Sequence, residues 1–172
     1  MTTTGDRVFQ AIVADVEYPV FVVTGSASDE PAGCLVGFTT QCSIEPLRFL
    51  VCVSKNNHTW EIAMRTSTLA VHLVRPDQRD LAAHFGSRSA KDDPMKMASW
   101  PLLDGPEGVP IVPGCDWFQG RVLDRFDLGD HTGFLLEPVD GRLGRDGDGQ
   151  LGFQGAADID AGQPAGTPED PA

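Results

Sequence analysis

Six short apolar runs, separated by turn residues and short helical patterns, constrain the fold of this chain most. They are rich in β-branched and aromatic residues, as strands are. They occupy residues 18–25, 33–39, 47–54, 69–74, 115–127 and 132–140. The connections do not alternate regularly between strand and helix, which disfavours a doubly wound parallel sheet. The pattern predicts a mainly β protein, an antiparallel barrel with helices at its edges.

Three short helices are expected between these runs. In residues 7–16 the apolar side chains recur at i, i+3, i+4 and i+7, which is one face of a helix. Asn57 or Thr59 is placed to cap a second helix. A third helix, over residues 75–86, would begin at an N-cap formed by Asp77.

Size and charge limit the class of protein. The chain has 172 residues, enough for one domain, and a net charge of −12, which repels a nucleic-acid backbone. No apolar stretch approaches the roughly 20 residues of a membrane span, and the first residues show no signal-peptide pattern. The four cysteines form no CxxC pair, so reduced thiols, a cytoplasmic location and no metal site are expected.

The composition changes after residue 140. Residues 141–172 contain eight Gly, three Pro and six acidic residues against two basic ones. Such a segment has too little apolar surface to offset its chain entropy. We therefore expect one domain over residues 1–140 and a mostly disordered tail over 141–172, with Leu151 and Phe153 as its only candidate anchors.

The first candidate binding segment is GFTTQCS, residues 37–43, between the second and third strands. Hydroxyl groups and free backbone N–H groups in a bend are suited to binding an anionic phosphate. Serine and threonine are also common in ordinary polar turns. The segment alone therefore leaves a binding site and a plain turn both open.

The second candidate segment is SKNNHT, residues 54–59, between a strand and a helix. Lys55 supplies a full positive charge there, and the helix start adds unpaired N–H groups. A phosphate would meet charge and donors together. Simple helix capping with a solvated Lys55 explains the same residues.

The third candidate segment is GDHT, residues 129–132, at the turn before the last strand. His131 is able to titrate near neutral pH and to face a ligand, although a lone histidine in a hairpin is more often a surface residue. The four histidines are scattered and give no metal spacing. Neither a P-loop nor a nucleophile elbow is present.

Taken together, these segments resemble the flavin reductase-like family. The resemblance rests on the order GFT, then S-x-x-P before an apolar strand, VSKNNHT, L-A-x-x-F-G and GDHT, between about residues 6 and 139. It implies a six-stranded antiparallel Greek-key split barrel that binds FMN, with FAD as the other option. It also implies hydride transfer from NADH or NADPH, a homodimer, and an oxygenase partner that receives reduced flavin.

The resemblance also assigns residues. Phe38, Thr39, Thr40, Gln41, Cys42 and Ser43 would lie along the flavin ring and ribityl chain. Ser54, Lys55, Asn56, Asn57 and Thr59 would hold the phosphate or the chain next to it. Phe85 would close over the flavin, and His131 would sit where nicotinamide docks, as the catalytic residue.

The loop after GFT is shorter than the family pattern, and Glu45 and Leu47 replace the usual Asp and second Pro. This departure motivates an alternative, a non-catalytic flavin-binding redox carrier that accepts electrons from a protein partner. Two further hypotheses keep the barrel. In one, the protein binds deazaflavin or pyridoxamine phosphate instead of FMN. In the other, it binds no cofactor and serves protein interaction.

Overall fold

The computed structural model describes residues 2–89, 91–144, 149–162 and 166. Its main strands are β1 (Phe21–Ala27), β2 (Glu30–Val36), β3 (Thr39–Ser43), β4 (Arg48–Ser54), β5 (Thr68–Leu73), β8 (Asp116–Asp127) and β9 (His131–Arg142). Its helices are α1 (Thr4–Ala14), α2 (His58–Ala63) and α3 (Arg79–Gly86). The short elements are β6 (Leu103–Asp104), β7 (Pro110–Ile111) and the 3₁₀ turns η1 (Pro106–Gly108) and η2 (Gln154–Ala156).

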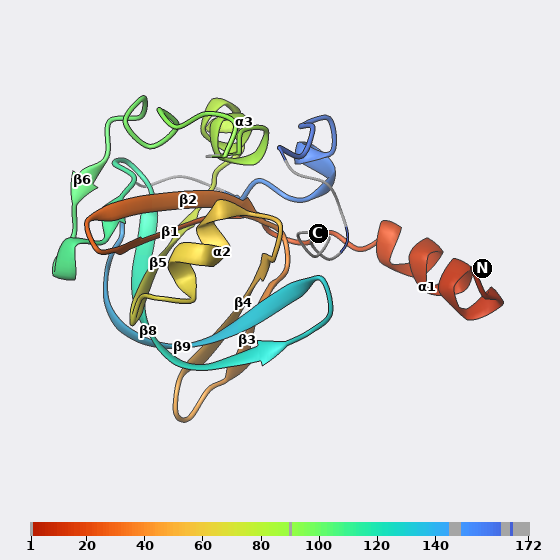
Figure 1. Ribbon diagram of the computed structural model, residues 1–172. Coiled ribbons are helices and arrows are strands. Elements are labelled where there is room, and N and C mark those ends of the chain that lie inside the picture. Colours follow the sequence, from red (N-terminus) through yellow and green to blue (C-terminus); the bar gives the residue numbers. More distant parts are fainter. Residues whose placement is uncertain (1, 90, 145–148, 163–165, 167–172) are drawn as a thin grey trace, which may run out of the picture.

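The seven main strands form one strongly curved antiparallel sheet, in the order β2-β1-β5-β8-β9-β4-β3, that does not close on itself (Figure 1). The expected mainly β, antiparallel architecture is therefore confirmed. The sheet has one strand more than expected. The additional strand is β3. Its sequence TTQCS is polar and lacks the apolar pattern of a strand, but its backbone pairs with the edge of β4.

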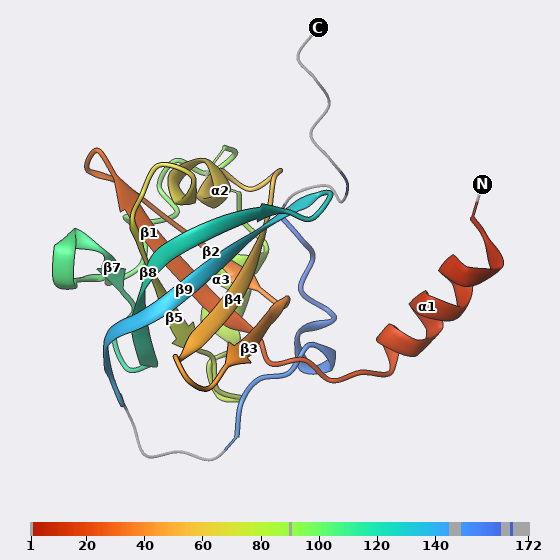
Figure 2. The ribbon, with the colours of Figure 1, turned by 90° about the horizontal axis from the view of Figure 1, so that it is seen from below.

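Two hairpins organise the sheet. β1 and β2 pair from Phe21–Val36 to Ala27–Glu30, and the turn is formed by Ser28 and Asp29, both with positive φ (52° and 63°). Such a two-residue turn follows the right-handed twist of the strands. The long β8–β9 hairpin turns at Gly129 (φ 100°), where a side chain is rarely tolerated, and its tip crosses beside β4 (Figure 2).

The three helices relate differently to this sheet. α1 begins with a capping box between Thr3 and Asp6, buries no residue and projects from the body (Figures 1 and 2). α2 is capped by the Asn57 side chain and packs against β1, β2 and β4. The N-cap of α3 is Gln78, whose side chain makes no capping hydrogen bond, so the expectation of an Asp77 cap is wrong. Within the described ranges no helix combines the length and hydropathy of a membrane span.

The core has two main parts. One lies beneath α2 and includes Val23, Val51, Leu69 and Phe134, all at most 1% exposed. The other lies beneath α3 and includes the fully buried Val22 and Val74. Alternate side chains of β1 thus face the two clusters, as the two-residue repeat of a strand requires.

Part of the tail packs on the body. β9 continues to Arg142, and the backbone N–H of Leu151 donates to the Val74 carbonyl at 2.7 Å. Leu151 is 4% exposed, and burial of such a side chain offsets the ordering of a short segment. Leu151 therefore acts as the anchor expected of it, and residues 145–148, 163–165 and 167–172 lie outside the described part. The expectation of a mostly disordered tail stays a prediction. The division at residue 140 stays a prediction.

Candidate functional site

The strand register brings the predicted binding segments together. Ser54 lies opposite His131 in the β4–β9 pair. The carbonyl of Phe38 accepts the Cys52 N–H at 2.9 Å, and the Lys55 N–H donates to the Asp130 carbonyl at 2.9 Å. Residues 37–39, 52–57 and 129–132 therefore form one neighbourhood, although up to 95 positions separate them in the sequence.

A cavity of about 160 Å³, the loop cavity, opens at this meeting point. Phe38, Ser54, Asn57 and His131 line it, together with Gly37. The Phe38 and His131 rings are tilted, with centroids 5.2 Å apart. Hydroxyl, amide and imidazole groups thus converge at the edge of an aromatic surface, which is how ligand sites combine orientation with apolar contact.

A larger cavity of about 610 Å³, the arm cavity, lies between α1 and the β3–β4 edge. Phe38, Thr39 and Thr40 line it on the sheet side, and Phe9 and Val13 line it on the helix side. Among the described residues, Oγ1 of Thr39 is one of four buried side-chain N or O atoms without a hydrogen-bond partner. A buried hydroxyl left unpaired costs stability, so a polar group of a ligand is its natural complement.

A third cavity of about 280 Å³, the α3 cavity, joins Asn57 to Phe85 and Gly86. Phe85 belongs to α3 and is 1% exposed, and its ring lies edge-to-face with that of Trp100, with centroids 6.0 Å apart. It therefore lines a cavity from within the core. Gln41, Cys42 and Ser43 line a separate recess at the β3–β4 hairpin, away from His131.

Lys55, Asn56 and Thr59 are engaged by the protein itself. Lys55 Nζ forms an ion pair with Asp127 at 2.8 Å, and hydrogen bonds from Lys55 and from the Gly129 N–H lower the pKa of this carboxyl. Asn56 Nδ2 donates to the Gly166 carbonyl at 2.6 Å. Thr59 is 2% exposed, and its N–H donates to the Asn57 side chain at 2.9 Å.

His131 is held by its neighbour in the turn. Its Nδ1 lies 2.7 Å from Asp130 Oδ1, which makes Nδ1 the donor because a carboxylate only accepts. This hydrogen bond lowers the pKa of Asp130. The imidazole is therefore oriented before any ligand arrives.

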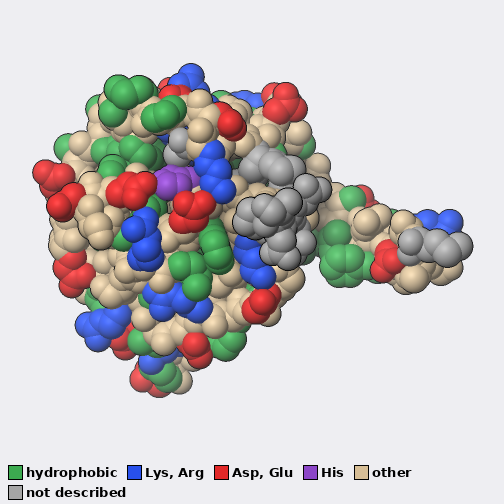
Figure 3. Space-filling model, viewed as in Figure 1, with side chains coloured by type: hydrophobic (Ala, Val, Ile, Leu, Met, Phe, Trp, Pro, Cys, Tyr) green, Lys and Arg blue, Asp and Glu red, His purple; other side chains and the backbone are tan. Residues whose placement is uncertain are grey.

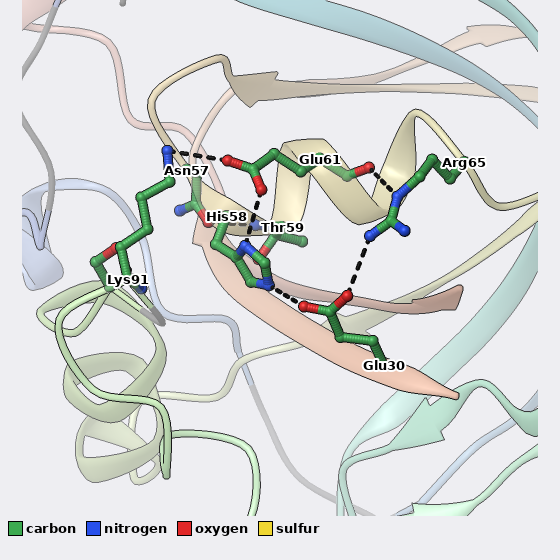
Figure 4. Close-up of polar contacts among 8 residues, drawn as sticks. Glu30, Asn57, His58, Thr59, Glu61, Arg65 and Lys91 are labelled. Carbon is green, nitrogen blue, oxygen red and sulfur yellow. Dashed lines mark hydrogen bonds and ion pairs between the residues drawn. The ribbon is translucent and has the colours of Figure 1, made fainter. Parts of the chain in front are cut away.

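A chain of alternating charges fixes the start of α2 (Figure 4). His58 lies between two carboxylates, with Nε2 2.9 Å from Glu30 and Nδ1 3.2 Å from Glu61. Arg65 and Lys91 complete the chain at 3.1 Å and 3.0 Å. In space-filling form, basic and acidic side chains are interspersed on the face seen in Figure 3. The network ties α2, β2 and the segment after α3 together.

Burial on its own raises the pKa of Glu61. Hydrogen bonds and charges from Lys91 and His58 outweigh it and hold this pKa below its ordinary value. Glu61 therefore stays ionised to a lower pH than an ordinary glutamate, which preserves its contacts with Lys91 and His58. Among the described residues, no three His, Cys, Asp or Glu side chains gather as a metal site would require.

Sequence reasoning missed three parts of these cavities. Phe153, expected only as an anchor of the tail, lines all three of them. Cys52 is half-buried and lines two of them. α1 forms one wall of the arm cavity. An aromatic residue within a Gly-rich segment was the available signal for Phe153.

The residues present fit a flavin nucleotide. Thr39 offers an unpaired buried hydroxyl, Ser54 and Asn57 offer donors beside a helix start, and the arm cavity has room for a flat apolar ring. Gly37 leaves space at the junction of two cavities, since a Cβ there would lie 2.8 Å from the Phe153 ring.

Comparison with known proteins points the same way. The chain is 26% identical over 151 residues to the 4-hydroxyphenylacetate 3-monooxygenase reductase component of Pseudomonas aeruginosa, covering 86% of this chain and 87% of that protein. It is 31% identical over 139 residues to the FMN reductase (NADH) SmoA of Agrobacterium fabrum, covering 80% and 76%.

Among solved structures, it is similar to the NADH:FAD oxidoreductase SgcE6 of Streptomyces globisporus in complex with NAD and FAD fragments. The TM-score is 0.75 and the identity 26%, over 91% of this chain and 93% of that one. The model of the flavin reductase like domain matches residues 13–158. The chain therefore belongs to the flavin reductase like domain family.

Proposed function

We propose that this protein is an NAD(P)H-dependent flavin reductase that supplies reduced flavin to a partner such as an oxygenase. The observation that carries the proposal is the convergence of Phe38, Ser54, Asn57 and His131 on one cavity, next to the unpaired hydroxyl of Thr39. Two relatives named above are an NADH-dependent FMN reductase and a monooxygenase reductase component.

FMN is the proposed flavin, with FAD as the alternative, and NADH or NADPH is the proposed donor. Thr39 and Thr40 would face the ring and ribityl chain from the sheet edge, and Ser54 and Asn57 would face the phosphate end. Lys55 would leave or share its partner Asp127 to reach the phosphate. Gln41, Cys42 and Ser43 would contribute by shaping the β3–β4 hairpin.

The flavin, when bound, supplies the hydride-accepting chemistry, and the protein supplies position and electrostatics. His131 is the proposed catalytic residue because its ring, oriented by Asp130, lies beside Phe38 at the loop cavity. There it would hold the nicotinamide against the flavin and keep water from the reacting face.

Assembly and location are proposals as well. We propose a homodimer, supported by the exposed apolar side chains of α1, which include Phe9 (65% exposed) and Ile12 (61%). A cytoplasmic location is supported by the four cysteines, all of which are free. A six-stranded Greek-key core, with β3 as an added edge strand, is the finer description that we propose for the sheet.

Anaerobic addition of NADH or NADPH to the flavin-loaded protein tests the function. The visible absorption band of the flavin is expected to bleach with at least one nucleotide, and free FMN is expected to turn over in the steady state. A bound flavin that stays oxidised with both nucleotides contradicts the reductase. It would instead favour the redox carrier, which accepts electrons from a protein.

A further inference from the structure

Phe153 lies where the three cavities of the site meet. It lines the arm cavity together with Thr39, the loop cavity together with His131, and the α3 cavity together with Phe85. Whichever of these cavities a flavin ring enters, its walls include Phe153. We propose that Phe153 is a binding residue for the flat ring of the flavin, so that the C-terminal segment 150–156 is part of the site.

This inference rests on the proposed flavin-binding function and adds a residue to it. The segment that carries Phe153 is fixed on both sides of the ring. The Phe153 N–H donates to the Tyr18 carbonyl at 2.7 Å, and Val20 N–H donates to the Leu151 carbonyl at 3.0 Å. Leu151 and Ala156 are buried. The aromatic ring is therefore presented by an anchored backbone, as a binding residue requires.

The ring also has a defined orientation. It lies nearly parallel to the Phe38 ring, at an interplanar angle of 10° with centroids 6.5 Å apart. A Cβ placed on Gly37 would lie only 2.8 Å from Phe153 Cδ2 and Cε2, so the ring rests against the glycine backbone. Two parallel aromatic faces beside cavities suit a planar heterocycle, which gains from offset stacking.

Phe153 is 43% exposed although its neighbours Leu151 and Ala156 are buried. A large apolar side chain that is anchored yet half-exposed loses contact with water when a ligand covers it. Phenylalanine has no group that binds phosphate, so its contribution concerns the ring alone. The inference therefore separates Phe153 from Lys55, whose charge would serve only the phosphate.

Affinities of Phe153→Ala for FMN and for riboflavin test this role. Loss of one stacking partner is expected to weaken the binding of FMN and of riboflavin by a similar factor, roughly 5- to 100-fold. Phe126→Ala is the matched control, since Phe126 has the same side chain, is 42% exposed and does not belong to the lining of the three cavities. It is expected to bind both flavins as the wild type does.

Unchanged affinity of Phe153→Ala for both flavins overturns the inference, and so does a loss confined to FMN. If that variant does not fold, Phe153→Trp and Phe153→Tyr replace it. Indole and phenol rings quench the fluorescence of an isoalloxazine that they touch, so stronger quenching than in the wild type supports contact, and equal quenching refutes it. A wild-type protein that binds no flavin refutes the proposed function itself, which distinguishes the two failures.

Discussion

On one side of the molecule, β1, β2 and β5 with α2 and α3 bury polar groups together with their hydrogen-bond partners. On the other side, α1, β3 and the β3–β4 hairpin leave apolar side chains in solvent. We name these the closed side and the open side. On the closed side, the buried Thr24 donates to the Pro110 carbonyl at 2.5 Å, and the buried Lys96 donates to the Phe85 and Arg88 carbonyls.

The open side shows the opposite pattern. Phe9, Ile44 and Leu47 are 65%, 79% and 56% exposed, and the buried hydroxyl of Thr39 has no partner among the described residues. Buried polar groups that have hydrogen-bond partners are compatible with a stable fold. Exposed apolar patches and unpaired buried polar groups are typical of surfaces that bind a ligand or another protein. The difference is the one expected if the closed side maintains the fold and the open side, as proposed above, binds the flavin and a second subunit.

The largest effect is expected at the centre of the closed side. Ile62 of α2 is fully buried and packs against Ala27 of β1 and Ala32 of β2. Ile62→Ala is expected to lower the free energy of unfolding by about 2–5 kcal/mol, because the transfer energy is lost and a cavity remains. Urea denaturation measures this loss. A loss below about 1 kcal/mol would show that the closed side is loosely packed.

The buried His72 is expected to make the closed side sensitive to acid. Its Nδ1 donates to the Val22 carbonyl at 3.0 Å, and its Nε2 accepts the Val112 N–H at 3.1 Å, so the folded protein holds it neutral. Burial lowers its pKa from 6.5 to about 4, although the hydrogen bond to Val22 opposes this. The unfolded chain therefore binds the proton more readily than the folded one.

The resulting stability is complete above pH 6.5 and is lost as the pH falls through that value towards 4. The loss amounts to about 3 kcal/mol. Urea unfolding of the wild type and of His72→Gln, compared at about pH 4.5 and at about pH 7, isolates the contribution of His72. The variant is expected to show a flatter profile. Parallel profiles would assign the acid sensitivity to other groups.

Lys55 sits where the two sides meet. Lys55→Ala is expected to weaken the binding of FMN by about 1–3 kcal/mol and to leave the binding of riboflavin almost unchanged, because only FMN carries the phosphate. Asp127→Asn removes the competing carboxylate, so it is expected to tighten FMN binding. Fluorescence titration with both flavins measures this. Equal losses for both flavins in Lys55→Ala would place the phosphate elsewhere.

Sequence reasoning predicted the closed side better than the open side. The apolar runs of β1 and β5 have the composition of buried strands, and Asn57 was one of the two cap candidates because its side chain acts on the next turn. Such signals are local. Each of the three candidate binding segments lies next to an apolar run in the sequence, and this was enough to place it at the end of a strand.

The open side depends on contacts between distant residues. β3 is a strand only because the β4 edge lies beside it, and Phe153 reaches the site only because segment 150–156 bonds to Tyr18. The engagement of Lys55 by Asp127, 72 positions away, is equally invisible in the sequence. The prediction for the tail was based on its composition, which gives the number of apolar residues but not which of them contact the body.

The hydroxyl of Thr39 offers a finer test of the open side. Thr39→Val removes the unpaired buried oxygen, so the stability of the flavin-free protein is expected to stay unchanged or to rise slightly. Flavin affinity is expected to fall by about 0.5–1.5 kcal/mol if a ligand supplies the missing partner. Thr66→Val is the control, because its buried hydroxyl donates to the Thr68 carbonyl at 3.2 Å and it does not belong to the lining of the three cavities. Equal effects of both variants would contradict a special role for Thr39.

The smallest effect on the fold is expected in α1, where Phe9 contacts little of the body. Phe9→Ala is expected to change the unfolding free energy of the monomer by less than about 0.5 kcal/mol, since the side chain is 65% exposed and alanine favours a helix. The same change is expected to weaken self-association, measured by light scattering across a dilution series. A monomer destabilised by more than about 1.5 kcal/mol would show that α1 packs on its own body. The arm cavity would then be part of the closed side, and a second subunit would not be needed to cover it.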